Sequence, residues 1–403
     1  MGREFKDSGI EWIGRIPKEW KTERIKALFS ERNERDCQGK TLLSVSQYFG
    51  IRPKSETDLA DSHIAESYDD YKEVHKGDFV MNIMLAWNGS YAVSDYDGIV
   101  SPAYCVFKFR KDCCKKFFHY LLRTDGYPLA FKTMSRGVID SRLRLYPEQF
   151  YTFPVVMPPL EEQKRIADYL DEKCGEIDSL IELQEQMIVQ LTDYKQSIIT
   201  EAVTKGLDPN ATLVPSGIDW IDVIPNGWRV CRIKDMVNLQ SGTNLTTMDI
   251  ADTGIYPVFG GNGLRGYYHQ YSNDGDYILI GRQGALCGNI NYANGKFWAT
   301  EHAVVCYPKR EFARKWFGEL LRAMNLGQYS LSAAQPGLAV ERIKNIEMPL
   351  PPLSEQHAIA SYLDTKCSEI DTLIALKQQK IETLKDYKKS MIYECVTGKT
   401  DIL

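Results

Sequence analysis

The chain has 403 residues, too many for one compact core, so we expect two to four domains. Hydrophobic residues make up 43% and charged residues 26% of the chain, and no apolar stretch approaches the roughly 18 residues of a membrane span. This argues against a membrane-spanning helix, and the lack of a signal-peptide core at the N-terminus predicts a cytoplasmic location.

The net charge of −5 is distributed unevenly along the chain. Residues 151–206 carry −6 and residues 347–403 carry −2, whereas residues 1–150 carry +2 and residues 207–346 carry +1. The near-neutral segments can hold local basic faces, which permits nucleic-acid binding without demonstrating it.

An internal repeat is the most informative feature of the sequence. Residues 158–206 and 351–399 align without a gap, with 29 of 49 positions identical. A shorter repeat precedes each copy: S-G-I-E-W-I-G-R-I-P-K-E-W starts at Ser8 and S-G-I-D-W-I-D-V-I-P-N-G-W at Ser216. The stretches between them do not resemble each other in sequence. The pattern predicts a pseudo-two-fold scaffold that presents two different surfaces.

Residues 1–157 are predicted to form a first mixed α/β lobe, with a strand in residues 78–84 and a helix over residues 115–122. A polar, aromatic loop precedes this helix and a basic cluster follows it. Such side chains can grip DNA phosphates and bases, although a charge cluster is more often a solvated face. The candidate residues are Trp87, Asn88, Lys132, Arg136, Ser141, Arg142 and Arg144.

Residues 158–206 and 351–403 are each predicted to form a long helix, because apolar residues recur at alternating spacings of four and three. A helix this long has no core of its own. We therefore expect an intramolecular antiparallel coiled coil; the alternative is that each helix packs on its own lobe. The predicted seam residues are Leu170, Ile177, Ile181, Ile188, Leu191 and Ile198 in the first helix, and Leu363, Ile370, Ile374, Ile381, Leu384 and Met391 in the second. The remaining positions of the ten-position seam are Cys174, Gln184, Lys195 and Ala202 in the first helix, and Cys367, Lys377, Lys388 and Cys395 in the second.

Residues 207–350 are predicted to form a second lobe, with a strand in residues 276–281 and a helix over residues 313–324. Gly261, Gly263 and Gly266 match G-x-G-x-x-G, but a strand-like aromatic run follows where a dinucleotide site needs a helix. We interpret this segment as an exposed, tightly turned loop that reads base edges; the alternative is an ordinary hairpin with a solvated arginine. The candidates of this lobe are Asn262, Arg265, Tyr267, Tyr268, His269, Gln270, Arg282 and Gln283.

Motifs for catalysis and metal binding are absent from the sequence. There is no G-K-[ST] phosphate loop, no H-E-x-x-H and no G-x-S-x-G, and the six histidines have no metal-ligand spacing. The ten cysteines include no C-x-x-C pair, which favours reduced, mostly buried thiols. The triplet from Glu162 to Lys164 has the E-x-K form of some nucleases, but an acid at a helix start explains it more simply. We expect a non-catalytic chain without a metal site.

The chain resembles the specificity (S) subunit of type I restriction–modification enzymes over essentially its whole length. The resemblance rests on the two paired repeats together with the lobe segments 97–104, 256–263 and 280–284. It implies two target-recognition domains that each read half of a bipartite double-stranded DNA target. It also implies helices that set the half-site spacing and dock two methyltransferase (M) subunits, which restriction (R) subunits then join.

By the same resemblance no cofactor belongs to this chain: S-adenosylmethionine is bound by the M subunit, and ATP and Mg²⁺ act on the R subunit. The expected architecture is α+β, with recognition lobes at 1–157 and 207–350 and conserved helical repeats at 158–206 and 351–403. The competing interpretation is a non-catalytic coiled-coil scaffold whose lobes bind proteins. A scaffold of that kind would show no salt-dependent affinity for DNA.

Overall fold

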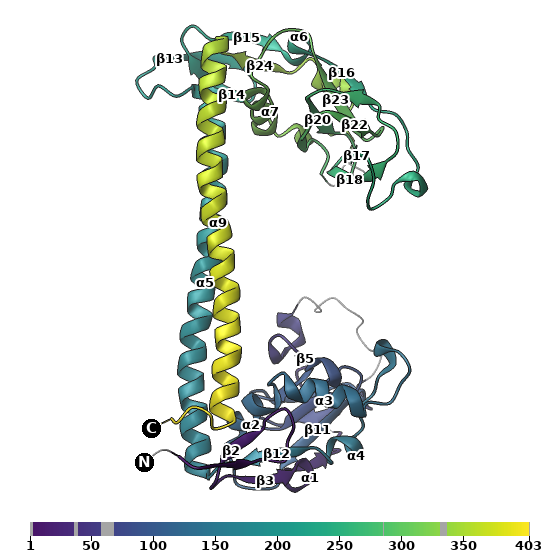
Figure 1. The fold of residues 1–403 in the computed structure, drawn as a ribbon, viewed down its shortest axis with the longest axis vertical. Helices are drawn as coiled ribbons and strands as arrows, with labels where there is room; N and C mark the ends of the chain where they lie inside the picture. The colour runs from purple at the N-terminus through teal and green to yellow at the C-terminus, as the bar shows by residue number, and fades with distance from the viewer. Residues whose placement is uncertain (1–2, 36–38, 58–67, 285, 331–336, 403) are drawn as a thin grey trace. The chain divides into compact units, whose positions relative to one another are not determined.

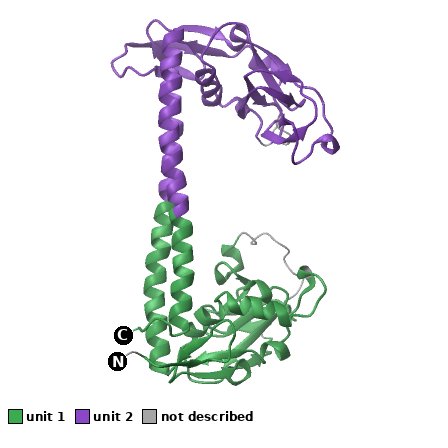
Figure 2. Ribbon diagram, viewed as in Figure 1, with its two compact units in different colours: residues 1–184, 380–403 green, residues 185–379 purple. Residues whose placement is uncertain are grey.

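The computed structural model describes residues 3–35, 39–57, 68–284, 286–330 and 337–402 (Figure 1). The chain divides into two compact units: unit 1 comprises residues 1–184 and 380–403, and unit 2 comprises residues 185–379 (Figure 2). Each unit holds one mixed lobe and a stretch of both long helices. The predicted α+β class with a pseudo-two-fold internal repeat is therefore confirmed.

The first lobe is built on a four-stranded antiparallel sheet in the order β4-β11-β8-β9. The strand predicted in residues 78–84 is β8, and the helix predicted over residues 115–122 is α2, so both predictions are confirmed. A second helix, α3, follows directly. The bounds are β4 (Phe29–Arg32), β8 (Phe79–Asn82), β9 (Tyr91–Val93), β11 (Tyr104–Phe109), α2 (Lys115–Leu122) and α3 (Gly126–Met134).

Shorter elements complete the first lobe. The hairpin β5–β6 is linked by a parallel bridge between Leu42 and Ile99 to strand β10, which pairs antiparallel with β7. Two further strand pairs, β1–β2 and β3–β12, bring the start of the chain and the approach to the first long helix together. Their bounds are β1 (Phe5–Asp7), β2 (Arg15–Pro17), β3 (Lys21–Arg24), α1 (Ile25–Leu28), β5 (Leu43–Ser46), β6 (Gly50–Pro53), β7 (Lys72–Val74), β10 (Gly98–Val100), α4 (Pro147–Phe150) and β12 (Pro154–Met157).

The second lobe has two four-stranded sheets, ordered β16-β23-β20-β21 and β18-β17-β22-β19. The strand predicted in residues 276–281 is β20, and the helix predicted over residues 313–324 is α7. The bounds are β13 (Leu213–Ile218), β14 (Ile221–Pro225), β15 (Arg229–Arg232), α6 (Ile233–Met236), β16 (Val237–Ser241), β17 (Tyr256–Gly260), β18 (Gly263–Tyr268), β19 (Asn273–Asp274), β20 (Tyr277–Gly281), β21 (Ile290–Ala293), β22 (Lys296–Ala299), β23 (Ala303–Pro308), α7 (Arg314–Ala323), α8 (Val340–Ile343) and β24 (Glu347–Leu350).

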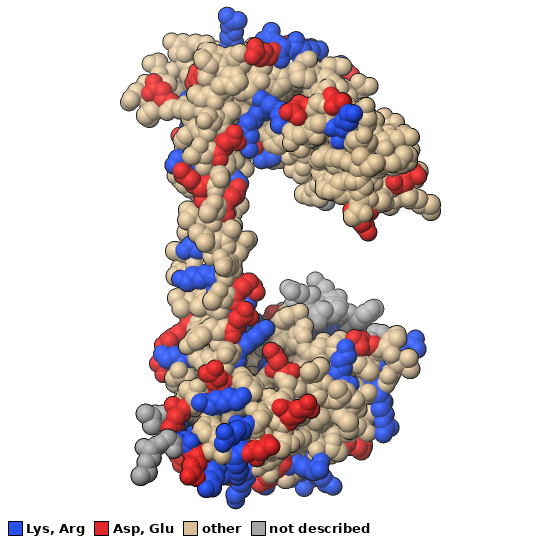
Figure 3. Space-filling model, in the orientation of Figure 1, with Lys and Arg blue, Asp and Glu red and all other residues tan. Residues whose placement is uncertain are grey.

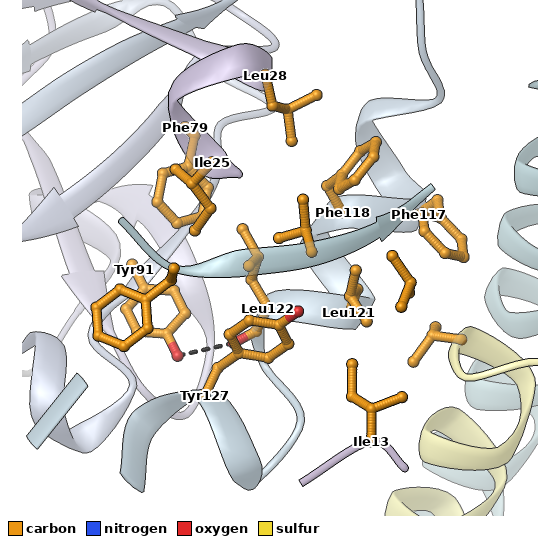
Figure 4. Packing of buried hydrophobic residues seen from close by; sticks show 14 of the residues in the cluster. Ile13, Ile25, Leu28, Phe79, Tyr91, Phe117, Phe118, Leu121, Leu122 and Tyr127 are labelled. Carbon is orange, nitrogen blue, oxygen red and sulfur yellow. Dashed lines mark hydrogen bonds between the residues drawn. The ribbon is translucent and has the colours of Figure 1, made fainter. Parts of the chain in front are cut away.

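The core of the first lobe is rich in aromatic side chains. Phe79 of β8 stacks on Phe150 with ring centroids 5.6 Å apart, and both are fully buried. Figure 4 shows the apolar side chains of α2, including Phe117 and Phe118, gathered in the same cluster as Phe79 and Tyr91. Buried aromatic area contributes much of the stability of such a core. The packed sheet and α2 therefore hold the loops at the edge of the sheet in place.

Two long helices are the repeated elements: α5 (Leu160–Lys205) and α9 (Leu353–Val396). Prolines precede both starts, and glycines with left-handed φ follow both ends, Gly206 at +76° and Gly398 at +70°. All twelve predicted seam residues are buried or half-buried along these helices. At 1.5 Å per residue, α5 is about 69 Å long.

Contacts inside each unit show that the helices pair antiparallel. In unit 1 the seam residues Leu170 and Cys174 of α5 join Met391 and Cys395 of α9 in one apolar cluster with the first lobe. In unit 2 the end of α5 and the start of α9 pack together on the second lobe in the same way, and this cluster includes Ile198, Ala202, Leu363 and Cys367. Each helix therefore starts on its own lobe and ends on the other, so packing on its own lobe alone is excluded.

The division into four segments, 1–157, 158–206, 207–350 and 351–403, stays a prediction.

In the part of the chain that the structure describes, no helix is both long and apolar enough to cross a membrane. None of the nine described cysteines forms a disulfide.

Candidate nucleic-acid interface

The two lobes share one strand topology although their sequences differ. The sheet β4-β11-β8-β9 corresponds strand for strand to β16-β23-β20-β21. In both lobes, the residue after the third strand of this order donates a backbone hydrogen bond to the residue before the second strand. Ile83 N donates to Ala103 O at 3.0 Å in the first lobe, and Arg282 N donates to His302 O at 2.8 Å in the second. The β8–β9 connection therefore corresponds to the β20–β21 connection. These two connections carry the candidates Trp87 with Asn88 and Arg282 with Gln283, a correspondence that the sequences do not reveal.

In the first lobe, Trp87 and Lys132 lie together. The Lys132 ammonium is 5.1 Å from the centre of the Trp87 ring and 2.8 Å from Asp140 Oδ2. The indole N–H of Trp87 donates to Met84 O at 3.0 Å, so only its ring surface is left for another contact. Asn88 Oδ1 accepts hydrogen bonds from the backbone N–H and the hydroxyl of Ser90, so this carbonyl shapes the turn.

The three candidate arginines of this lobe surround one open hollow of about 630 Å³, which Tyr146 and the carboxylate of Glu148 also line. Arg136 and Arg144 exchange two backbone hydrogen bonds of 2.9 Å, and Arg142 lies in the 3-10 turn Asp140–Arg142 between them, as does Ser141. All three arginines are exposed, and none has an ion-pair partner among the described residues. Unpaired guanidinium groups around a hollow are suited to phosphate oxygens.

In the second lobe, the glycine-rich motif forms the hairpin β17–β18, which turns at Gly261 and Asn262. Gly263, at φ +94°, is placed where its lack of a side chain permits the turn. A register shift after Val258 leaves Arg265 as the extra residue of a β-bulge. The three glycines therefore lie in a hairpin with no helix after it, as the sequence predicted, which removes the geometry of a dinucleotide site.

The other hairpin candidates lie along β18 and just beyond it. Tyr268 packs edge-on against Trp298 at 5.3 Å and lies 4.2 Å from the His269 ring. Tyr267 and Tyr268 are half-buried, whereas Asn262, Arg265, His269 and Gln270 are exposed. The polar groups at the turn thus face solvent while the tyrosines stiffen the strand.

The β20–β21 connection lies against the β17–β18 turn. A Cβ placed on Gly261 would lie 2.9 Å from Gln283 O and 3.3 Å from His302 O, and Asn289 Nδ2 donates to Asn262 Oδ1 at 3.4 Å. Arg282 is half-buried with Nη1 3.2 Å from Ser241 Oγ, and Gln283 is exposed. The candidates from two distant stretches of sequence therefore form one polar surface in this lobe.

A family model described as "Type I restriction modification DNA specificity domain" matches residues 17–193 and 225–386. The chain belongs to this family. The family model matches the chain twice, as the internal repeat does: each matched stretch contains most of one lobe and part of the long helix that follows it.

Curated relatives and solved structures agree with this assignment. The chain is 42% identical over 145 residues to the type I restriction enzyme EcoprrI specificity subunit of Escherichia coli, a match that covers 35% of each chain. It is 23% identical to the MjaVIII specificity subunit of Methanocaldococcus jannaschii, over 96% of this chain and 94% of that one. The EcoprrI match thus spans only about a third of that relative's length.

Two solved structures share the fold. A chain from the study "Structural basis underlying complex assembly and conformational transition of the type I R-M system" aligns with a TM-score of 0.72 at 18% identity, covering 96% of this chain and 99% of that one. The HsdS subunit of Thermoanaerobacter tengcongensis gives a TM-score of 0.54 at 19% identity, with 96% and 98% covered. At these identities the likeness concerns the fold alone.

The E-x-K triplet of this specificity-family chain anchors the start of α5. Glu162 accepts hydrogen bonds from Trp20 Nε1 at 2.9 Å and from Arg3 at 2.6 Å. The repeat counterpart of Glu162 makes the equivalent tryptophan contact in unit 2, where Glu355 accepts from Trp228 Nε1 at 3.0 Å. These contacts give the carboxylate a structural role at both helix starts.

One group in the described residues brings three possible metal ligands together: Glu34, Glu73 and His75. Glu34 already pairs with Arg32 at 2.7 Å and Glu73 with Lys40 at 2.5 Å. Cationic side chains of the chain itself therefore occupy the two carboxylates.

Two features beside the polar surfaces were missed by the sequence analysis. The β22–β23 turn carries buried atoms without a hydrogen-bond partner among the described residues: Thr300 Oγ1, Glu301 Oε2 and His302 Nδ1. At the β5–β6 turn of the first lobe, Tyr48 is 85% exposed. The turn sequence Gln47–Phe49 has no basic residue, so charge gave no signal there, and unpaired atoms become visible only in a structure.

Proposed function

We propose that this chain is a DNA-specificity subunit in which each lobe reads one half of a bipartite double-stranded target. The paired helices set the spacing of the two halves and dock two methyltransferase subunits, which restriction subunits join. The observation that carries the proposal is the equivalence of the lobes: one topology presents Trp87 and Asn88 in one lobe and Arg282 and Gln283 in the other at corresponding connections. Two lobes with the same strand topology and different exposed side chains suit two different half-sites.

The charges of the lobes fit sequence readout better than strong nonspecific binding. In Figure 3, Lys and Arg side chains are interspersed with Asp and Glu over the face of unit 1 in view. A protein whose affinity came from phosphate neutralisation alone would need a face of one sign. We therefore propose that the partner subunits supply much of the affinity, whereas this chain supplies the choice of sequence.

The outer faces of the helices support two equal docking sites. Unit 1 exposes Leu180 and Leu183 of α5 and Tyr387 of α9, and unit 2 exposes their repeat counterparts Leu373, Leu376 and Tyr194. These six side chains lie outside the seam and are 43–59% exposed. Exposed apolar groups on a helix pair mark a protein contact, and their repetition at equivalent positions of the second unit suits two copies of one partner.

We place no cofactor on this chain. In the proposal S-adenosylmethionine belongs to the methyltransferase subunits, and ATP and Mg²⁺ belong to the restriction subunits. The residues of this chain bind and position DNA and perform no chemical step.

Methylation sequencing of host DNA, with the gene intact and deleted, tests the proposed function. We expect adenine methylation at one bipartite motif to disappear on deletion and to return with a plasmid copy. If the methylome is unchanged although the partner methyltransferase is expressed, the chain does not direct modification. The protein-binding scaffold would then be the better explanation.

A further inference from the structure

The hairpin β5–β6 of the first lobe occupies the place of the hairpin β17–β18 in the second. In the first lobe, Leu42, directly before β5, forms a parallel bridge with Ile99 of β10. In the second lobe, Val258 of β17 pairs in parallel with Trp298 of β22. β10 and β22 correspond, because each directly precedes the sheet strand β11 or β23. Each of them pairs antiparallel with a short strand, β7 or β19. The tip at Gln47–Phe49 is therefore the counterpart of the turn at Gly261 and Asn262.

The tip is held rigidly although it is exposed. Arg123, which is half-buried, donates one hydrogen bond to Gln47 O at 2.6 Å and another to Tyr91 O at 2.7 Å. The backbone N–H of Tyr48 donates to Ser46 Oγ at 3.1 Å. Gly50 turns with a φ of +74°, and a Cβ placed on it would lie 3.3 Å from Ala92 Cβ. A side chain presented by such a fixed loop loses little conformational entropy on binding.

The turn that carries Tyr48 lies beside the β8–β9 connection. A Cβ placed on Gly89, the residue after Asn88, would lie 3.7 Å from Gln47 Cβ. Arg52, on the second strand of the hairpin, places its guanidinium carbon 5.5 Å from the centre of the Phe49 ring and brings a cation to the same turn. An exposed aromatic ring with a hydroxyl, on a hairpin that also carries a cation, matches the chemistry of a base edge and its sugar.

We propose that Tyr48 is a specificity-determining residue, which contacts one base pair of the half-site read by the first lobe. This proposal rests on the proposed function and deepens it by naming a reading element. Tyr48 is 85% exposed and supports no core contact, so its burial by DNA gives a structural reason for an aromatic residue at this tip.

The test is methylation sequencing of cells that express the chain, with its partner methyltransferase, as wild type, Tyr48→Ala or Tyr96→Ala. Tyr96 is a matched control: it is 38% exposed in the same lobe and follows the opposite end of β9. We expect Tyr48→Ala to admit other bases at one position of one half-site, with discrimination there falling roughly tenfold. We expect Tyr96→Ala to leave the motif unchanged.

Binding of the purified methyltransferase complex to short duplexes gives the second measurement. With Tyr48→Ala, affinities for duplexes that differ at the affected position should converge, while discrimination at all other positions persists. An unchanged motif, or an equal loss on every duplex, would overturn the assignment of Tyr48. Absence of a bipartite motif with the wild-type chain would instead overturn the proposed function, so the two failures are distinct.

Discussion

Lys195 of α5 and Asp371 of α9 form an ion pair of 2.7 Å, and the repeat reproduces it: Lys388 of α9 lies 2.6 Å from Asp178 of α5. Both lysines occupy seam positions, where their stems are half-buried, and both aspartates flank the seam. A polar residue at a seam position specifies the register of a coiled coil at some cost in stability. The two pairs therefore define one antiparallel alignment of the helices.

The Lys195–Asp371 pair predicts a small, salt-sensitive coupling. In a double-mutant cycle of Lys195→Ala and Asp371→Ala, we expect a coupling of about 0.5 kcal/mol in the free energy of unfolding, because the pair is partly exposed. Urea unfolding at low and high salt measures it. The cycle of Lys388 and Asp178 is the matched comparison and should give a similar value. A coupling that does not fall with salt would contradict the electrostatic explanation.

The two long helices and their seam were predictable from the sequence because their signals are local and repeated. Spacings of four and three persist over ten positions in each helix, and two copies with 29 of 49 identities confirm one another. The lobes offer weaker signals, since most of their strands are three to six residues long and their pairing joins distant stretches. The parallel approach of Leu42 to Ile99, for example, depends on tertiary contacts that no local pattern encodes.

The sequence located exposed polar regions of the two lobes, but not which of their atoms are free to bind. The arginines around Gly137 and the hairpin at Asn262 form exposed polar surfaces in the structure. Asn88, however, uses its side-chain carbonyl within the turn, and Tyr48 carries no charge that would single it out. Residue types show what a side chain is able to bind, whereas hydrogen-bond partners decide which atoms are free to do so.

Arg265 is expected to read a base, and its position on a bulge provides an indirect test. Arg265→Ala should weaken binding by about 1–3 kcal/mol and relax one position of one half-site. Gly260→Ala should have a similar, smaller effect, because a Cβ on Gly260 would meet Arg265 Cδ at 2.4 Å and displace the side chain. Methylation sequencing of both variants measures this. A loss shared equally by all sequences would identify Arg265 as a phosphate contact instead.

His119 makes the first lobe sensitive to acid. Burial lowers the pKa of His119 to about 3, and its Nδ1 accepts a hydrogen bond from the Val93 N–H at 3.3 Å. Because the folded pKa lies below the unfolded value of about 6.5, the stabilising effect of the neutral ring is complete above pH 6.5 and is lost as the pH falls toward 3.

Between pH 6.5 and pH 3 the free energy of unfolding should fall by at most about 1.4 kcal/mol per pH unit. The actual fall should be smaller, because His119 keeps part of its surface in water. Thermal unfolding between pH 7 and pH 5 measures it, with His119→Gln as the comparison, since glutamine retains an acceptor and does not titrate. If both proteins lose stability equally over this range, other groups cause the acid sensitivity.

The proposed spacing role of the helices predicts the result of an insertion. We expect seven residues inserted between Ile188 and Leu191, with seven more between the counterparts Ile381 and Leu384, to preserve the heptad seam and lengthen both helices by about 10 Å. At 3.4 Å per base pair, the spacer of the methylated motif should grow by about three base pairs while both half-sites stay the same. A four-residue insertion at the same sites is the comparison, because it adds a stutter that locally unwinds the coiled coil and lengthens both helices by about 6 Å, so the spacer should grow by about two base pairs. If the seven-residue variant methylates the original spacing, or reads different bases, the helices do not set the distance between the half-sites.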